Sequence, residues 1–406
     1  MAIGMDDIAR RYLLLALRLA RLRKGLMVAY LGPAELAEVV AGELPTSARE
    51  LHDEALRLNE SATDQTLGSG TDGTRAAWLG AQLTALSAAA RTLAGDEIAL
   101  PELVEQLLDL PAEREPEASL TAAHRLLDAA LPPGPSLRGR LAEHRRETVV
   151  PAEQVPAVAN QLISLLRERC VQDLSLPAGE LLLLEPWQIA GGSWDIRTAA
   201  AGPRETRLEL NLAIEWPLDT LLRSVAAESY PGRHAQRVSR QQAVAEQAER
   251  WEASAWCSVT PDAVLADGLG GVGREAVLGD FELGAELRRI GHKVGLRVDV
   301  ERDLEVGRGR RLLAPAASNA ALLLHQDGLP APEVRGYLAE MGLLTEREVD
   351  RVMERLADPL LRVEPFSRAF APPLVSSWLQ VTGQTSGVAR LLREQLTPGR
   401  LRDEAA

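Results

Sequence analysis

Apolar residues recur at every third or fourth position through most of the first 175 residues, with arginine and glutamate between them. This spacing places the apolar side chains on one face of an amphipathic helix. The helices predicted in this way cover residues 7–26, 33–41, 47–59, 76–93, 102–110, 119–130, 137–147 and 156–172. We therefore expect residues 1–175 to form an N-terminal helical region, interrupted by a glycine-rich loop at residues 68–74.

The next part of the chain has a shorter, strand-like pattern. Residues 179–187, 193–198 and 206–214 carry alternating or briefly continuous apolar positions, and turn residues at 189–192 and 199–205 separate them. Such segments are typical of β-strands joined by tight connections. We therefore predict a small antiparallel β-sheet of about three strands.

Helical spacing returns after Leu218 and continues to about residue 250. Further helices are predicted at residues 321–325, 332–341, 346–357 and 374–379, whereas the polar segment 297–310 shows no assignable pattern. Residues 176–406 are thus expected to combine the sheet with a second helical region, either as a separate domain or as one continuous domain with residues 1–175. The predicted fold class is mainly α-helical.

Composition excludes some kinds of partner. The 406 residues include 45 Lys and Arg against 58 Asp and Glu, a net charge of −13, whereas nucleic-acid binding depends on clustered positive charge. The two cysteines, Cys170 and Cys257, fit a reducing compartment. No apolar run approaches the ~18 residues of a membrane span, and charged residues interrupt the apolar N-terminal segment, so we expect no nucleic acid, no membrane and a cytoplasmic location.

One predicted helix contains two residues that disfavour helices. The stretch "LLRSVAAESYPGRHAQRVSR", residues 221–240, places Pro231 next to Gly232. Inside a helix, proline is less favourable than alanine by about 3 kcal/mol and glycine by about 1 kcal/mol. A bent backbone at this point therefore has a purpose beyond regular helix formation.

The surrounding sequence resembles a bacterial metallopeptidase-like family of largely unknown function. The stretch "TRLELNLAIEWPLDTLLRSVAAESYPGRHAQ" is similar to the core of that family, which reads "SRIEINTDLP…HEGYPGHHTE". The segments "MVAYLGPAEL", "SNAALLLHQDGL", "YLAEMGLLTE" and "DPLLRVEPFSRAF" resemble other parts of it in the same order, so the likeness spans most of the chain. The family is distantly similar to helical zinc peptidases such as the Taq-type carboxypeptidases, which implies a helical architecture with the sheet beside a central cleft.

The resemblance implies where a metal site would be. In the family motif His-Glu-x-x-Pro-Gly-His, the two histidines are expected to bind zinc and the glutamate to act as general base, while a later Glu-Gly pair supplies the third ligand. Zinc held in this way acidifies a bound water, and the glutamate takes its proton. The Pro-Gly bend lets two imidazoles six residues apart converge on one ion.

This chain departs from the motif at the metal ligands. Ala227 and Arg233 occupy the two histidine positions, Glu228 keeps the position of the general base, and Asp267 replaces the later glutamate. His234 corresponds to an extra histidine that often follows the second ligand. Alanine has no lone pair and a guanidinium cannot bind a cation, so we predict that zinc and any other cofactor are absent, with Glu228 the vestige of the catalytic residue.

Losing the metal would leave two carboxylates without a neutralising charge. We expect Arg233 to pair with Glu228, with Asp267 or with both, because unpaired carboxylates in a partly buried cleft are unfavourable. The alternative is that Arg233 points to solvent.

Other candidate residues carry weaker signals. Tyr230 and Arg362 are assigned to the cleft by the resemblance, although Val363, Glu364 and Pro365 stand where the family has an aromatic-rich run. The segment "GLGGVG" at residues 268–273 matches a dinucleotide-binding pattern but lacks the surrounding strand–helix–strand unit, so we interpret it as a helix that packs closely under the site. His325 lies on an apolar helix and is interpreted as a core histidine.

The leading functional hypothesis is a non-catalytic member of the metallopeptidase-like family. Such a pseudoenzyme would bind a peptide-like ligand or a protein partner in the inherited cleft, for example by strand addition at the sheet edge. One alternative is an active metal-dependent hydrolase that uses Glu228, His234 and Asp267. The other is a structural subunit of an assembly in which the cleft is empty.

Overall fold

The computed structural model describes residues 5–69, 73–190, 194–202, 204–246 and 250–406. Helices make up 69% of the protein, which confirms the predicted fold class. The N-terminal helices are α1 (Asp7–Leu22), α2 (Ala34–Gly42), α3 (Ala48–Ser69), α4 (Gly73–Leu93), α5 (Leu100–Leu108), α6 (Glu117–Ala130), α7 (Leu137–Glu147) and α8 (Val155–Leu174). Residues 70–72 of the predicted glycine-rich loop lie outside the described residues, while its flanks belong to α3 and α4.

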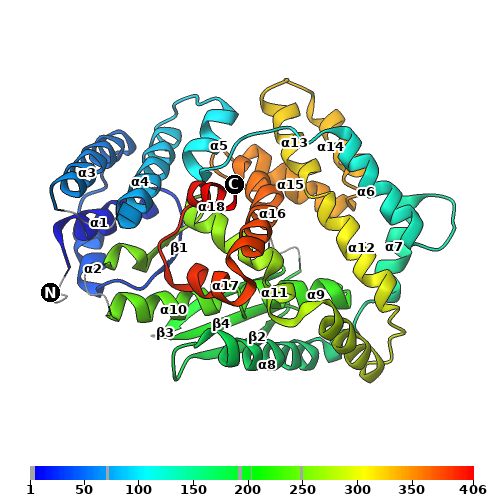
Figure 1. The fold of residues 1–406 in the computed structure, drawn as a ribbon. Coiled ribbons are helices and arrows are strands. Elements are labelled where there is room, and N and C mark those ends of the chain that lie inside the picture. The colour runs from blue at the N-terminus through cyan, green and yellow to red at the C-terminus, as the bar shows by residue number, and fades with distance from the viewer. Residues whose placement is uncertain (1–4, 70–72, 191–193, 203, 247–249) are drawn as a thin grey trace.

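The C-terminal half is also mainly helical. Its helices are α9 (Leu218–Glu228), α10 (Arg233–Glu246), α11 (Pro261–Lys293), α12 (Val300–Leu312), α13 (Pro315–His325), α14 (Ala331–Met341), α15 (Glu346–Ala357), α16 (Glu364–Thr382), α17 (Gln384–Arg393) and α18 (Pro398–Ala405). Helices α11 and α16 lie at the centre, with α1 to α4 on one side of them and α6, α7 and α12 on the other (Figure 1).

The two predicted regions share their hydrophobic cores. One core contains Leu13 of α1 together with Phe366 of α16. A second core joins Leu162 of α8 to Leu222 of α9 and Trp378 of α16. Because apolar side chains from both ends of the chain pack together, the helices on either side of residue 175 stabilise one another.

The three predicted strands are present, but their pairing is mixed. The strands β2 (Leu181–Trp187), β3 (Ile196–Gly202) and β4 (Glu205–Asn211) lie in the order β2-β4-β3. Strand β3 is antiparallel to β4, whereas β2 is parallel to it. The expectation of a wholly antiparallel sheet is therefore wrong for β2, because the chain passes from β2 to the far edge before β4 returns between them.

One face of the sheet packs against the helical core. Thr206, Leu208 and Leu210 of β4 are fully buried on the face that meets the helical core, whereas Leu181 and Leu183 of β2 remain exposed. The predicted turn at residues 199–205 begins too early, since β3 continues to Gly202. The position of β3 at the sheet edge, next to α9, brings it to the candidate site.

Several elements were not predicted, or were predicted only in part, from the sequence. A second small sheet pairs β1 (Met27–Tyr30) with β5 (Ala255–Cys257), which lie more than two hundred residues apart. The polar segment 297–310 forms most of α12, in which Gly309 lies against the side chain of Leu127 on α6. Helix α11 begins with Pro261 after the capping residue Thr260, whose hydroxyl accepts a hydrogen bond from the Ala263 amide.

The glycine-rich run 268–273 is a close-packing surface of α11, as predicted. A Cβ atom at Gly268 would lie 2.5 Å from Val375 and 2.8 Å from the Ala371 carbonyl oxygen of α16. A Cβ atom at Gly271 would lie 2.7 Å from Pro372. Glycine therefore lets α11 and α16 approach more closely than any larger residue would permit. Across the described residues, no helix is both long and apolar enough to cross a bilayer.

We predict that Gly268→Ala destabilises the protein and that Gly336→Ala does not. The added methyl group at position 268 meets backbone and side-chain atoms of α16, and overpacking of this kind costs about 1–3 kcal/mol. At Gly336 of α14 a Cβ atom would meet nothing within 4 Å, so the higher helix propensity of alanine should raise stability by up to ~1 kcal/mol. Urea unfolding of both variants gives the comparison, and equal stabilities would contradict the proposed packing role.

Candidate functional site

A sharp bend separates α9 from α10 at Pro231 and Gly232. The Tyr230–Pro231 peptide bond is cis, and a Cβ atom at Gly232 would lie 1.9 Å from the Ala227 carbonyl oxygen. Only glycine fits so close to the preceding helix. The bend thus brings the start of α10 back toward the last turn of α9, and Arg233 lies next to Glu228.

Arg233 bridges the two carboxylates that the resemblance assigns to the site. Its Nε donates to Glu228 Oε1 at 3.0 Å, and its Nη2 donates to Asp267 Oδ1 at 2.6 Å. All three side chains are partly buried. The expectation that Arg233 pairs with both carboxylates is confirmed, and its guanidinium joins the ends of α9, α10 and α11.

The remaining carboxylate oxygens also have partners. Glu228 Oε2 accepts hydrogen bonds from the Thr198 amide and hydroxyl, each at 3.0 Å, and Asp267 Oδ2 accepts one from the Ser367 hydroxyl at 2.8 Å. Burial lowers the pKa of Arg233, but the charges of Glu228 and Asp267 outweigh this effect and raise it above its ordinary value. Each oxygen of the pair is therefore engaged by a hydrogen-bond donor.

Sequence reasoning did not find Thr198 or Ser367. Thr198 lies on the edge strand β3, and Ser367 lies 100 residues beyond Asp267 on α16. Neither belongs to a local motif, so only the fold brings them to the carboxylates. The only available signal was that a buried carboxylate requires donors.

Ala227 contributes space to the site and no polar group. A Cβ atom at Gly270 of α11 would lie 3.1 Å from the Ala227 methyl group, so the two helices meet closely here. The structure brings Ala227, Glu228, Arg233 and Asp267 together, as the resemblance implied.

His234 and Tyr230 lie in a separate, fully buried cluster. His234 Nε2 lies 2.8 Å from Glu180 Oε2 and its Nδ1 lies 2.7 Å from the Thr206 hydroxyl. The Tyr230 hydroxyl donates to the same Glu180 oxygen, and Arg167 Nε donates to Glu180 Oε1 at 2.6 Å. Both side chains were expected in the cleft, but Tyr230 before the bend and His234 after it both point to Glu180, which immediately precedes β2.

The ring nitrogens of His234 are both committed to this cluster. Burial lowers its pKa, although the neighbouring Glu180 carboxylate acts in the opposite direction. The alternative metal site built from Glu228, His234 and Asp267 therefore finds no support in the geometry, because His234 is directed toward Glu180 and Thr206 instead.

Arg362 also lies outside the cleft, contrary to expectation. Its Nη2 donates to the Ile98 carbonyl oxygen at 3.0 Å, and it lines a different cavity of about 570 Å³ together with His325. His325 Nε2 lies 2.8 Å from the Leu356 carbonyl oxygen, as expected for a structural histidine. The short 3-10 helix Leu361–Val363 turns Arg362 toward the segment before α5, and Glu364 and Ser367 of α16 face the candidate site.

The residues present do not fit a zinc ion. Zinc needs about three protein ligands with free lone pairs. Within the described ranges no three His, Cys, Asp or Glu side chains are grouped so that they could hold a metal. At this site the Arg233 guanidinium contacts both carboxylates, and the side chains of Ala227 and Arg233 offer no lone pair.

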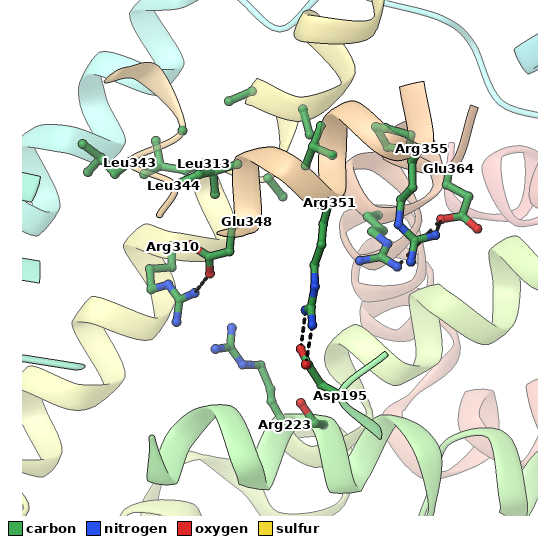
Figure 2. Close-up of a pocket in the computed structure, with 18 of the residues that line it drawn as sticks. Asp195, Arg223, Arg310, Leu313, Leu343, Leu344, Glu348, Arg351, Arg355 and Glu364 are labelled. Carbon is green, nitrogen blue, oxygen red and sulfur yellow. Dashed lines mark hydrogen bonds and ion pairs between the residues drawn. The ribbon is translucent and has the colours of Figure 1, made fainter. Parts of the chain in front are cut away.

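A cavity of about 490 Å³ lies one turn of α9 away from this group of charges, and Figure 2 shows ten of its lining residues labelled. Arg223 and Ser224, which precede Ala227 by one turn of α9, line one wall, and Glu364 of α16 lines another. Further lining residues come from α7, α12, α13, α15 and the segments before β3 and α15. The volume falls in the range of about 300–1,000 Å³ that small-molecule sites occupy.

Comparisons with known proteins show the fold alone. No family model and no curated protein matches the chain. A solved protein from Colwellia psychrerythraea, provisionally described as a lipoprotein, is similar over 92% of this chain with 11% identity and a TM-score of 0.50. A second, from Shewanella oneidensis, provisionally described as a lipoprotein of unknown function, covers 92% of this chain with 12% identity and a TM-score of 0.44. This chain spans 62% of the first and 76% of the second.

We predict that Arg233→Ala lowers the free energy of unfolding by about 2–4 kcal/mol, because the change leaves two carboxylates with an unbalanced charge. The matched control is Arg308→Ala, an arginine of α12 that is 56% exposed and pairs with Glu305 of the same helix at 3.2 Å. That control should change stability by less than ~1 kcal/mol. Urea unfolding gives both values, and equal losses would show that Arg233 acts as an ordinary surface charge.

A double-mutant cycle tests the pairing itself. Asp267→Asn should be less destabilising in an Arg233→Met background than in the wild type, because the charge that Asp267 balances is already gone. Additive losses would mean that the two side chains do not interact in solution.

The pH dependence of stability should depend on His234. Because burial lowers the pKa of His234, the unfolded chain takes up a proton below about pH 6.5 while the folded protein does not. The unfolded state then binds more protons, and the free energy of unfolding falls as the pH falls. In His234→Gln this slope should be shallower between pH 6.5 and 5, by at most ~1.4 kcal/mol per pH unit. An unchanged slope in chemical unfolding would contradict the neutral buried imidazole.

Proposed function

We propose that this protein is a non-catalytic member of the metallopeptidase-like family that it resembles, and that it binds a ligand in the inherited cleft. The observation that carries the proposal is the position of the Arg233 guanidinium, which contacts Glu228 at 3.0 Å and Asp267 at 2.6 Å. A permanent cation held between the two carboxylates supplies one of the two positive charges that a zinc ion supplies in a peptidase. It offers no water ligand and no Lewis acid.

The hydrogen bonds around the two carboxylates support the same proposal. A general base needs a free lone pair directed at the reacting water. Both oxygens of Glu228 are engaged, one by Arg233 and the other by Thr198. This arrangement stabilises the ionised carboxylate and holds it away from proton transfer.

The neighbouring cavity supports a binding role. A purely structural role does not require a cavity of about 490 Å³ lined by charged side chains, whereas a ligand-binding role does. Strand addition is less favoured than a ligand in this cavity, since the Thr198 amide at the middle of the edge strand already donates to Glu228. The occupant we propose is a peptide-like ligand or a segment of a protein partner. The cytoplasmic location stays a prediction, because a shared fold at 11% identity carries no information on location.

The metal part of the proposal is tested by zinc stoichiometry. Untagged protein is equilibrated with zinc, desalted and measured by elemental mass spectrometry. Wild type should retain no zinc above background, and a triple variant with Ala227→His, Arg233→His and Asp267→Glu should retain close to one ion. Retention of about one zinc by the wild type, with loss in Asp267→Ala, would overturn the proposal in favour of a metal-dependent hydrolase.

The ligand part is tested with a defined peptide mixture. A tryptic digest of serum albumin is incubated with the protein, separated by ultrafiltration and identified by mass spectrometry. We expect a subset of peptides to be retained intact. New cleavage products would indicate a hydrolase, and no retention at all would favour the structural subunit.

A further inference from the structure

The cavity beside the candidate site is rich in positive charge, although the whole protein carries a net charge of −13. Among the described residues that line it, five are arginines and three are carboxylates. The arginines are Arg223, Arg310, Arg351, Arg355 and Arg368, and the carboxylates are Asp195, Glu348 and Glu364. A cation excess in a recess of a strongly acidic protein is a local feature that bulk composition cannot explain.

The three carboxylates do not neutralise this excess of positive charge, because each of them pairs with two arginines. Asp195 accepts from Arg351 and, at 3.1 Å, from Arg347. Glu348 pairs with Arg145 at 3.0 Å and with Arg310 at 3.5 Å.

Glu364 shows the same sharing. It pairs with Arg355 and, at 3.8 Å, with Arg368. The pairing therefore leaves positive charge on the cavity wall.

The excess is concentrated at Arg223 and Arg310. The Arg310 guanidinium lies 3.5 Å from Glu348 Oε1, which is the outer limit of a hydrogen bond. Burial and the nearby charge of Arg223 lower the pKa of Arg310 to about 10. Arg223 lies 3.0 Å from Asp219, but that carboxylate also accepts from Arg274 at 2.7 Å. Figure 2 shows the Arg223 side chain directed into the space between Arg310 and Arg351.

Like charges held together in a partly buried recess favour an anion between them. The Arg310 and Arg223 side chains are only 23% and 21% exposed, so solvent screens them incompletely. A guanidinium presents five donors in a planar fork that matches the oxygens of carboxylate and phosphate.

Part of the cavity wall is apolar. Leu313, Leu343 and Leu344 lie beside Arg310 and Glu348 in Figure 2 and line the same cavity. A ligand that fills the cavity would thus contact both arginine and leucine side chains.

We propose that this cavity binds an organic anion, with one carboxylate or phosphate group between Arg223 and Arg310 and an apolar body against Leu313, Leu343 and Leu344. The proposal rests on the proposed function in that it names the chemistry of the ligand that the inherited cleft accepts. It needs neither a metal nor the Glu228–Arg233–Asp267 group, whose residues lie at the end of α9, at the start of α10 and on α11.

The test uses four probes that share one apolar chain. Octanoate and octyl phosphate carry the two anionic groups, octanol carries no charge and octylammonium carries the opposite charge. Isothermal titration of the full-length protein should show binding of at least one anion, at least 10-fold weaker binding of octanol and none of octylammonium. The stronger of the two anions identifies the source as a carboxylate or a phosphate.

Variants locate the site. Arg223→Gln and Arg310→Gln should each weaken anion binding by about 10- to 100-fold, the range expected when a charge-assisted hydrogen bond is lost. Arg310→Lys, which keeps the charge but loses the fork, should weaken it less than Arg310→Gln. The control is Arg308→Gln, an exposed arginine on the same helix that does not line the cavity, and it should leave binding unchanged. Thermal midpoints of all variants show whether each is folded.

The outcomes separate this proposal from the proposed function. Binding of octanol as tightly as the anions, or unchanged binding in folded Arg223→Gln and Arg310→Gln, overturns the anion site. If albumin peptides are retained while neither anion binds, the anion site fails and the ligand-binding function stands. If an anion binds at these arginines while no peptide is retained, the anion site stands and the peptide-like ligand is wrong.

Discussion

The contact between Arg233 and the carboxylates of Glu228 and Asp267 is the interaction on which the centre of the protein depends. Two partly buried carboxylates would repel each other, and their removal from water would be unfavourable without a compensating charge. Because the guanidinium is charged at any ordinary pH, the compensation is permanent. The same contact joins the C-terminus of α9, the N-terminus of α10 and the first turns of α11.

That contact requires helices to approach one another unusually closely. Gly232 lets the bend lie against the Ala227 carbonyl, and Gly270 lets α11 lie against the Ala227 methyl group. Gly268 and Gly271 allow α16 to pack on the other face of α11, which places Ser367 within reach of Asp267. Glycines that weaken α11 as an isolated helix are therefore what lets it hold the charged group in the folded protein.

Two neighbouring sites differ in how their charged side chains are paired. At the Arg233 group every carboxylate oxygen has a donor, and one guanidinium between two carboxylates leaves a net negative charge. The second site is the cavity lined by Arg223, one turn earlier on α9, and by Arg310 of α12. It contains more arginines than its carboxylates can neutralise. In our proposal the first site preserves the shape of an inherited cleft, and the second site binds the ligand.

The sequence by itself determined the features that are encoded locally. Helical spacing predicted α7 at residues 137–147 with its observed bounds, and alternation located the three strands of the sheet. The resemblance, which assigns positions 227, 228, 233 and 267 to one site, led to the prediction of the Arg233 pairing, and the observed contacts confirm it. Only the tertiary structure decided the strand order, the assignment of His234 and Tyr230 to a buried cluster and the placement of Arg362 at another cavity. It alone brought together Asp195, Arg223, Arg310 and Glu348. Periodicity and propensity describe neighbours along the chain. This cavity is formed by the packing of segments that are distant in sequence, so neither signal could predict it.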